Sequence, residues 1–302
     1  MIIVSTDSES DIKLLQRAYL MGIFLIFISV CTNLVEGMLV KIQGKKTENG
    51  IYIFNGLIAA FSMLFFVITN IDGFCYYENL IWYVLPSAVM YCTALVCTYK
   101  ALSCGSFAIS MLIISYSIVL PIIYGIVFLN EPVNMTTYLA FAVVAVSLYL
   151  SRGDTSGEQK GISAKWLFYI GVSTIGNGLF AVVKKIQQLH FNNSCNNEFM
   201  IFTLGITAVF LLIFGVCRKE GRYISVRMMA CAVGSGIFNG ITNMLTLIIN
   251  TMVALSVSSP INTGLKIVLS FVISGVLLKE KFLKRQIAGV GLGAIALILL
   301  SV

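Results

Sequence analysis

Residues 253–278 read VALSVSSPINTGLKIVLSFVISGVLL and hold a single charged side chain, Lys266. A run of about 20 apolar residues is long enough to cross the hydrocarbon core of a bilayer as an α-helix. Such a run is helical because lipid offers no hydrogen-bond partners, so the backbone has to satisfy its own N–H and C=O groups. This stretch therefore predicts a transmembrane helix, and similar runs recur along the chain.

The composition of the whole chain also indicates a membrane protein. Of its 302 residues, 58% are hydrophobic and 11% are charged, whereas soluble domains carry about 25% charged residues. The net charge of +7 is interpreted as basic loops beside helix ends rather than as a surface for nucleic acid. The eight cysteines form no C-x-x-C pair, so we expect small buried side chains rather than metal ligands or disulfides.

The apolar pattern predicts one domain, an all-α polytopic membrane protein with ten transmembrane helices. The predicted spans are Tyr19–Val40, Ile51–Thr69, Leu80–Tyr99, Ser106–Leu129, Met135–Leu150, Trp166–Val183, Phe199–Val216, Met228–Ile249, Val253–Leu278 and Gln286–Val302. They divide the chain into a polar N-terminal tail (1–18), a first five-helix half (19–151), a linker (152–165) and a second five-helix half (166–302). The acidic tail has neither the basic start nor the cleavage site of a signal peptide.

The two halves of the chain resemble each other. Setting Lys41-Ile42-Gln43 on Lys185-Ile186-Gln187 aligns the first span with the sixth, and setting Glu131 on Glu280 aligns the fourth and fifth spans with the ninth and tenth. Because five is odd, the second half has to begin on the opposite face of the membrane. We therefore expect inverted repeats, a plan of secondary transporters in which two related halves rock about a central site.

Short motifs in both halves carry a resemblance to a known family. They are Tyr99-Lys100-Ala101-Leu102 leading into Gly105–Asn130 and then Glu131, and, in the second half, Pro260–Leu278, Glu280 and Gln286–Gly289. With each half ending in a helix, a glutamate and one further helix, the chain resembles the drug/metabolite transporter (DMT) superfamily, specifically its EamA-like members. The resemblance implies an alternating-access permease for small metabolites or drugs. It does not identify the cargo, because the superfamily spans amino acids, sugars, nucleotide sugars and cations.

Basic residues predict the orientation of the chain. Outside the spans, the odd-numbered connections hold 15 Lys and Arg residues, and the even-numbered connections and both tails hold four. The odd connections are therefore expected in the cytoplasm, which places both termini outside. Family members are commonly drawn with both termini inside, so both orientations stay open. The expected location is a bacterial plasma membrane.

Lys266 is the most informative residue for function, because it lies near the middle of the ninth span. A lysine at mid-bilayer costs roughly 2.5 to 3.5 kcal/mol unless water or a partner compensates it. It belongs to a polar stripe at steps of three and four: Ser256, Ser259, Thr263, Lys266, Ser270 and Ser274. We interpret the stripe as a cavity wall whose ammonium binds an anionic group of the substrate. The alternative is a polar seam between helices with the lysine paired internally.

Glu36 is the only acidic side chain clearly inside a predicted span, and it shares a helix face with Ser29 and Asn33. A carboxylate in this setting can exchange a proton during transport, so Glu36 is the predicted proton-coupling residue. Small multidrug transporters, a related branch, also have a first-helix glutamate, but Phe180 occupies the matching position in the second half. The alternative is a glutamate that snorkels to the interface.

Further polar stripes predict a cavity between spans one, three, four, eight and nine, with Asn177 of the sixth. The eighth span adds Asn239, Asn243, Thr246 and Asn250 at steps of four, three and four. The predicted substrate-binding residues are Lys266, Asn33, Asn177, Asn243, Ser259, Asn262, Thr263, Tyr91 and Tyr124. Glu131 and Glu280 are predicted to be architectural, because each precedes a helix whose N-terminal partial positive charge favours a carboxylate.

An enzyme and a channel are the rival classes. The single histidine, His190, lies in a connection, and the sequence has no His/Cys metal cluster, no G-x-S-x-G motif and no phosphate loop. We therefore expect no catalytic site, metal or cofactor. The expected partners are the lipid bilayer and a small-molecule substrate, with the protein a monomer or homodimer. Lys266 favours a small polar metabolite with an anionic group, such as an amino acid; the alternative is a proton-coupled exporter of lipophilic cations.

Overall fold

The computed structural model describes residues 9–46, 49–70, 73–74, 77–128, 163–192, 194–252, 255–280 and 282–299, with a few single residues and pairs between 135 and 150. All of the secondary structure in these residues is helical. The helices are α1 (Glu9–Lys46), α2 (Ile51–Thr69), η1 (Glu78–Leu80), α3 (Ile81–Cys104), α4 (Phe107–Ser115), η2 (Tyr116–Ile118), α5 (Val119–Phe128), α7 (Ala164–His190), α8 (Asn196–Cys217), η3 (Glu220–Tyr223), α9 (Val226–Met252), α10 (Leu255–Val276) and α11 (Lys284–Leu299).

Within these residues, seven helical segments are long and apolar enough to cross a membrane, and α10 adds a shorter apolar stretch at Asn262–Val276. Large hydrophobic side chains also cover the outside of the protein, including Ile68, Trp82, Phe210 and Val268. In water such a surface would be an aggregation liability, whereas in lipid it is the solvated face. The chain is therefore an all-α polytopic membrane protein, as the composition predicts.

Several helices differ from the predicted spans. α7 continues seven residues past Val183 and ends at His190, so the histidine that the sequence places in a connection is the last residue of a helix. α1 begins at Glu9, ten residues before the apolar run at Tyr19, because the intervening segment contains good helix formers and neither proline nor glycine. The fourth span is divided into α4, η2 and α5. The 3₁₀ turn η2 precedes Pro121, which cannot donate a backbone hydrogen bond and whose ring disfavours the carbonyl four residues earlier. Most of the predicted fifth span and linker lies outside the described residues.

The helices alternate in direction, so their connections gather at two ends of the bundle. At one end, the start of α2 meets η3, since the backbone N–H groups of Tyr52 and Ile53 donate to Glu220 Oε2 (2.9 and 3.2 Å). At the opposite end, Asn197 Nδ2 donates to Asn70 Oδ1 (3.3 Å). We call the first end the basic end, because the odd-numbered connections that the structure describes lie there and are rich in lysine and arginine.

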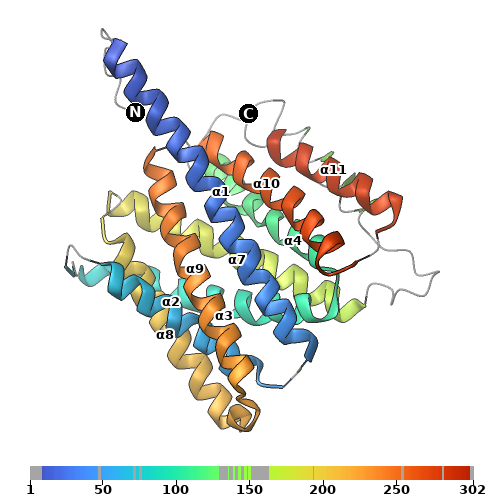
Figure 1. Ribbon diagram of the computed structural model, residues 1–302. Coiled ribbons are helices and arrows are strands. Elements are labelled where there is room, and N and C mark those ends of the chain that lie inside the picture. The colour runs from blue at the N-terminus through green and yellow to red at the C-terminus, as the bar shows by residue number, and fades with distance from the viewer. Residues whose placement is uncertain are drawn as a thin grey trace.

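The first helix of each half packs against helices of the other half. α1 runs the length of the bundle and contacts α9 and α10, as Figure 1 shows. In the same way α7 contacts α3, α4 and α5, and α2 packs against α8. At the edge of the bundle, α11 lies against α10 and α4 (Figure 1). Helices far apart in sequence therefore surround the centre of the molecule together.

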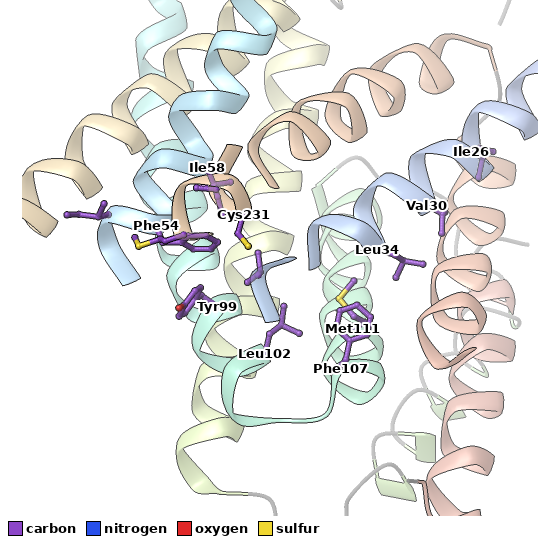
Figure 2. Packing of buried hydrophobic residues seen from close by; sticks show 14 of the residues in the cluster. Ile26, Val30, Leu34, Phe54, Ile58, Tyr99, Leu102, Phe107, Met111 and Cys231 are labelled. Atoms are coloured by element: carbon purple, nitrogen blue, oxygen red, sulfur yellow. The ribbon is translucent and has the colours of Figure 1, made fainter. Parts of the chain in front are cut away.

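The main buried cluster links α1 to its neighbours (Figure 2). Ile26, Val30 and Leu34 follow one another at steps of four along one side of α1 and are almost fully buried. Towards the basic end the cluster continues through residues of α2, α3 and α4, among them Phe54, Ile58, Tyr99, Leu102, Phe107 and Met111. This packing fixes the helix on which the predicted coupling residue lies.

Candidate functional site

Glu36 lies on α1 in the interior of the protein and is only 9% exposed. Its Oε1 accepts a hydrogen bond from Asn239 Nδ2 of α9 (2.9 Å). Its Oε2 is buried and has no hydrogen-bond partner among the described residues. Buried polar atoms are nearly always paired, so a free carboxylate oxygen here calls for an explanation.

Asn239 connects Glu36 to three further side chains, which form what we call the Glu36 cluster: Glu36, Asn239, Tyr91, Ser62 and Asn243. Tyr91 of α3 donates its hydroxyl hydrogen to Asn239 Oδ1 (2.9 Å). Ser62 of α2 lies within hydrogen-bond distance of the same oxygen (2.9 Å), and Asn243 Nδ2 lies 3.2 Å from it. Four helices, α1, α2, α3 and α9, therefore meet in one buried polar network.

Lys266 lies on α10, which packs against α1, and its positive charge attracts the carboxylate of Glu36. Among the described residues, however, the two charges do not form an ion pair within 4 Å. Thr263 of the same helix is buried, and Asn262 and Lys266 are half-buried. The side chain of Ser259 lies outside the described part of the structure. The predicted stripe of α10 thus brings a positive charge towards the Glu36 cluster from a fifth helix.

Other predicted binding residues lie at varying distance from this cluster. Asn33 is one turn from Glu36 on α1, and its Oδ1 is buried without a partner in the described residues. Asn177 donates to the Ser173 carbonyl of its own helix (2.8 Å). Tyr124 stacks on Phe128 near the end of α5, with ring centroids 5.1 Å apart. The structure brings Tyr91 and Asn243 into contact with Asn239, whereas the described contacts of Asn177 and Tyr124 are local.

An aromatic group adjoins the Glu36 cluster on the α7 side. The ring of Phe180 lies 5.2 Å from that of Tyr91, measured between centroids. Phe199 of α8 stacks on Phe180 at 6.5 Å with nearly parallel planes. The centre of the protein is therefore acidic and amide-rich towards α1 and α9, and aromatic towards α7 and α8.

A second buried polar group lies at the basic end, and we call it the Lys41–Glu280 clamp. Lys41 of α1, only 1% exposed, forms an ion pair with Glu280, which follows α10. Its ammonium also donates to the Gly105 carbonyl (3.0 Å). Glu280 accepts further hydrogen bonds from the hydroxyls of Ser274 and Ser106 (2.7 Å for Ser106). The clamp joins α1 and the α3–α4 turn of the first half to α10 of the second.

Glu280 caps a helix, but a different one from that predicted. The sequence places it before α11, whereas the backbone N–H of Phe107, the first residue of α4, donates to its carboxylate (3.1 Å to each oxygen). Burial alone would raise the pKa of Glu280. The hydrogen bonds from Lys41, Ser274 and Ser106 and the charge of Lys41 outweigh burial and hold this pKa below its ordinary value of 4.5. Its repeat-matched residue, Glu131, lies outside the described residues.

Trp166, at the start of α7, covers the turn that carries the clamp. Its indole N–H donates to Ser110 Oγ of α4 (3.2 Å), and its side chain is 5% exposed. A Cβ atom added at Gly105 would overlap Nε1 of the Trp166 indole. Glycine is therefore required at this turn for the two segments to approach each other.

Sequence reasoning misses two residues of these sites. Lys41 lies just beyond the predicted first span and reads as a loop lysine. Asn239 reads as one member of a stripe and not as the hub of a network. The signals that indicate them are the repeat match at Lys41 and the four-residue spacing of Asn239 from Asn243, close to one helical turn. In the part of the chain that the structure describes, no group of three His, Cys, Asp or Glu side chains could hold a metal ion.

Comparison with known proteins establishes a shared fold. No family model matches this sequence, and no curated protein matches it. A solved crystal structure of a protein does match, with a TM-score of 0.66 over 93% of this chain and 98% of the other, at 11% sequence identity. At that identity the similarity concerns the fold alone.

Proposed function

We propose that this protein is a secondary transporter that moves a small polar metabolite across the membrane by alternating access. The observation that carries the proposal is the buried Glu36 cluster, in which acceptor atoms of Glu36 and Asn33 have no donor among the described residues. An unpaired buried acceptor costs about 1–3 kcal/mol. A binding site for a substrate with donor groups accounts for that cost, because the substrate supplies the missing hydrogen bonds.

Alternating access by ten helices in two inverted halves is part of the proposal. The burial pattern of α2 and α8 supports it. Shifted by 145 positions, every buried residue of α2 falls on a buried residue of α8. The eight buried residues of α2 are Ile53, Phe54, Asn55, Gly56, Ile58, Ala59, Ser62 and Phe66. Two helices that share a burial pattern and pack against each other are expected where the two copies of a repeat meet.

Paired contacts between the other helices give the same support. Ser62 of α2 donates to the Gly236 carbonyl of α9 (2.7 Å), and Thr207 of α8 donates to the Ala88 carbonyl of α3 (3.3 Å). Adding 145 to the residue number of Ser62 gives Thr207, and adding 148 to that of Ala88 gives Gly236. The two contacts therefore correspond to each other in the proposed repeat. With the predicted shift of 144 for α1, the Glu36–Asn239 contact likewise corresponds to the Phe180–Tyr91 contact.

The charges around the site favour a substrate that carries an anionic group. Lys266 supplies a positive charge to bind it, and Glu36 with Asn33 supplies acceptors for a donor such as an ammonium. An amino acid combines both groups. Glu36 is the proton-coupling residue in this proposal, and Asn33, Asn243, Asn262, Thr263 and Tyr91 supply further polar contacts. The DMT resemblance and a bacterial plasma membrane belong to the same proposal.

The second candidate function is proton-coupled export of lipophilic cations. The observation that favours it is the aromatic pair Tyr91 and Phe180 beside the Glu36 carboxylate, because aromatic faces and a carboxylate together attract organic cations. Lys266 opposes it, since a fixed positive charge near the site repels a permanent cation. The two candidates therefore differ in the sign of the substrate charge that the site tolerates.

A thermal-shift screen of the purified protein distinguishes the candidates. The compounds are amino acids, organic acids, sugars, nucleotides and cationic dyes, each tested on the wild type and on Lys266→Ala. We expect stabilisation by compounds with an anionic group, lost in Lys266→Ala. Stabilisation by cationic dyes in both proteins would instead establish the exporter. Accumulation in vesicles that requires an ion gradient then separates a carrier from a channel.

A further inference from the structure

The side-chain amide of Asn239 has only one orientation that suits its surroundings. Asn243 Nδ2 donates to the backbone carbonyl of Asn239 (2.9 Å), which fixes the donor side of the Asn243 amide. The same Nδ2 lies 3.2 Å from the Asn239 side chain, so the Asn239 atom there has to be an acceptor. Asn239 therefore presents its oxygen to Asn243 and Tyr91, and its Nδ2 to Glu36.

This orientation makes the two oxygens of Glu36 unequal. Oε1 is held by Asn239, whereas Oε2 is buried with no partner in the described residues. A carboxylate with both oxygens free could rotate about its terminal bond, since such torsions are broad. One fixed donor on Oε1 prevents that rotation and points Oε2 to a single place.

We propose that Asn239 is a positioning residue for Glu36: it holds Oε1 and thereby presents Oε2 as the oxygen that binds the proton and the substrate's donor group. The proposal rests on the transporter function proposed above. It deepens that function by separating the group that titrates from the group that orients it. Tyr91 and Ser62 act one step further away, because they contact the Asn239 oxygen and not Glu36.

The proposed repeat supports the view that Asn239 is present because Glu36 is present. A shift of 148 places Asn239 on Tyr91, and these two residues contact each other, as equivalent groups beside a two-fold axis do. In the half where the α1 position is a glutamate, its partner on α9 is an amide. In the half where the equivalent α7 position is Phe180, the partner on α3 is the aromatic Tyr91. The amide of Asn239 thus pairs with the acid Glu36, whereas at the matching position of the other half the ring of Tyr91 pairs with the ring of Phe180.

Three side chains from neighbouring helices surround Glu36 in the described structure: Asn239, Lys266 and Tyr91. Asn239 on α9 donates a hydrogen bond to the carboxylate, which favours its ionised form. Lys266 on α10 attracts the ionised form from a distance. Tyr91 on α3 is the other titratable side chain of the cluster, and its hydroxyl contacts Asn239 and not the carboxylate. Removing the Asn239 donor while keeping the other two therefore shifts the balance towards protonated Glu36.

Labelling by dicyclohexylcarbodiimide tests this proposal without knowledge of the substrate, because the reagent reacts with protonated carboxyl groups in apolar surroundings. The purified full-length protein is labelled across a pH series, and the modified Glu36 peptide is quantified by mass spectrometry. Asn239→Leu removes the donor at similar volume. We expect the labelling midpoint of Glu36 to move to higher pH by about one unit, a tenfold change in proton affinity.

The matched control is Asn55→Leu, which removes another buried amide whose hydrogen bond goes to its own helix, at the Ile51 carbonyl (2.8 Å). This control is expected to keep the wild-type midpoint. Tyr91→Phe is the second variant, since it loosens the Asn239 orientation with less change in packing, and it is expected to give a smaller shift in the same direction. A wild-type midpoint in either folded variant of the cluster would overturn the proposal.

The outcome is independent of whether Glu36 couples transport to protons. If Glu36→Gln keeps its proton-driven transport, the coupling role fails while the labelling shift in Asn239→Leu still stands. If the labelling midpoint stays fixed and Glu36→Gln loses uphill transport, Asn239 is not the positioning residue and the transporter function survives.

Discussion

The Lys41–Glu280 clamp and the Glu36 cluster are both buried, both charged and both formed between the two halves of the chain, but they differ in how completely their polar atoms are paired. In the clamp, Glu280 receives donors from Lys41, Ser106, Ser274 and the backbone of Phe107. In the cluster, one oxygen of Glu36 has no donor among the described residues.

This difference distinguishes a structural group from the proposed binding group. In the clamp every carboxylate oxygen already accepts a hydrogen bond, so no acceptor remains for a ligand. We therefore interpret the clamp as a structural group that holds three segments together at the basic end. An acceptor left unpaired in the interior weakens the fold and is retained where a ligand or proton completes it. The comparison therefore predicts that mutations in the clamp lower stability, and that mutations in the cluster lower transport.

The largest effect on stability is expected for Glu280→Ala. The variant leaves the Lys41 ammonium buried without its counter-charge, which costs about 3–5 kcal/mol of unfolding free energy. Thermal unfolding of the purified protein measures the loss. The matched control is Glu220→Ala, which removes a half-exposed carboxylate from the N–H groups of Tyr52 and Ile53 and should cost about 1 kcal/mol. Equal losses in the two variants would contradict the role of the clamp.

Acid is expected to weaken the same clamp. The pKa of Glu280 is lower in the folded protein than its ordinary value of 4.5, so the folded state binds this proton less readily than the unfolded state. The stabilisation from Glu280 is therefore fully present above about pH 4.5 and is lost as the pH falls through the folded-state pKa. Unfolding temperatures across a pH series should show a decline below pH 4.5 that is reduced in Glu280→Gln. An identical decline in both proteins would assign the acid sensitivity to other groups.

Glu36→Gln is expected to leave stability within about 1 kcal/mol of the wild type. The amide keeps the size of the side chain, its oxygen can still accept from Asn239, and Oε2 has no hydrogen bond to lose among the described residues. Its effect falls on function, where uphill transport should be abolished and downhill exchange largely retained. Transport into vesicles with and without a proton gradient measures both. Unchanged proton dependence in Glu36→Gln would exclude the coupling role.

The smallest effect is expected for the hydroxyls of Ser62 and Thr207, which the proposed repeat relates to each other. Ser62→Ala and Thr207→Val each remove one hydroxyl donor to a backbone carbonyl and should each cost about 0.5–1.5 kcal/mol. Ser62 also reaches Asn239, so carbodiimide labelling of Glu36 should change in Ser62→Ala alone. A change of equal size in Thr207→Val would show that the labelling responds to general loosening of the helices.

Much of the fold follows from the sequence, because lipid imposes one rule on every apolar run. A segment such as 199–216 has no alternative to a helix in hydrocarbon, and α8 spans Asn196–Cys217. The helical start at Glu9 and the 3₁₀ turn before Pro121 are harder to predict, since they depend on local propensity and on backbone geometry. Apolar runs predict where the described membrane-spanning helices lie, and polar and proline residues set where each of them begins, ends and bends.

The candidate site is predictable only in part. The polar stripes give the faces of Glu36, Asn243 and Lys266, because the 3.6-residue period places them there. The pairing of Asn239 with Glu36 depends on a contact between residues 203 positions apart, which no local pattern encodes. The same holds for Lys41 and Glu280, whose partnership arises when α1 and the end of α10 meet beside the start of α4.

The contact between Trp166 and Gly105 gives the protein an optical signal of its own. The chain has two tryptophans, of which Trp82 is 72% exposed and Trp166 is 5% exposed. In Trp82→Phe, all indole fluorescence comes from Trp166. Its ring packs on Gly105, whose carbonyl accepts a hydrogen bond from the Lys41 ammonium. Separation of the segments at the basic end would expose this ring to water, shift its emission to longer wavelength and make it accessible to an aqueous quencher.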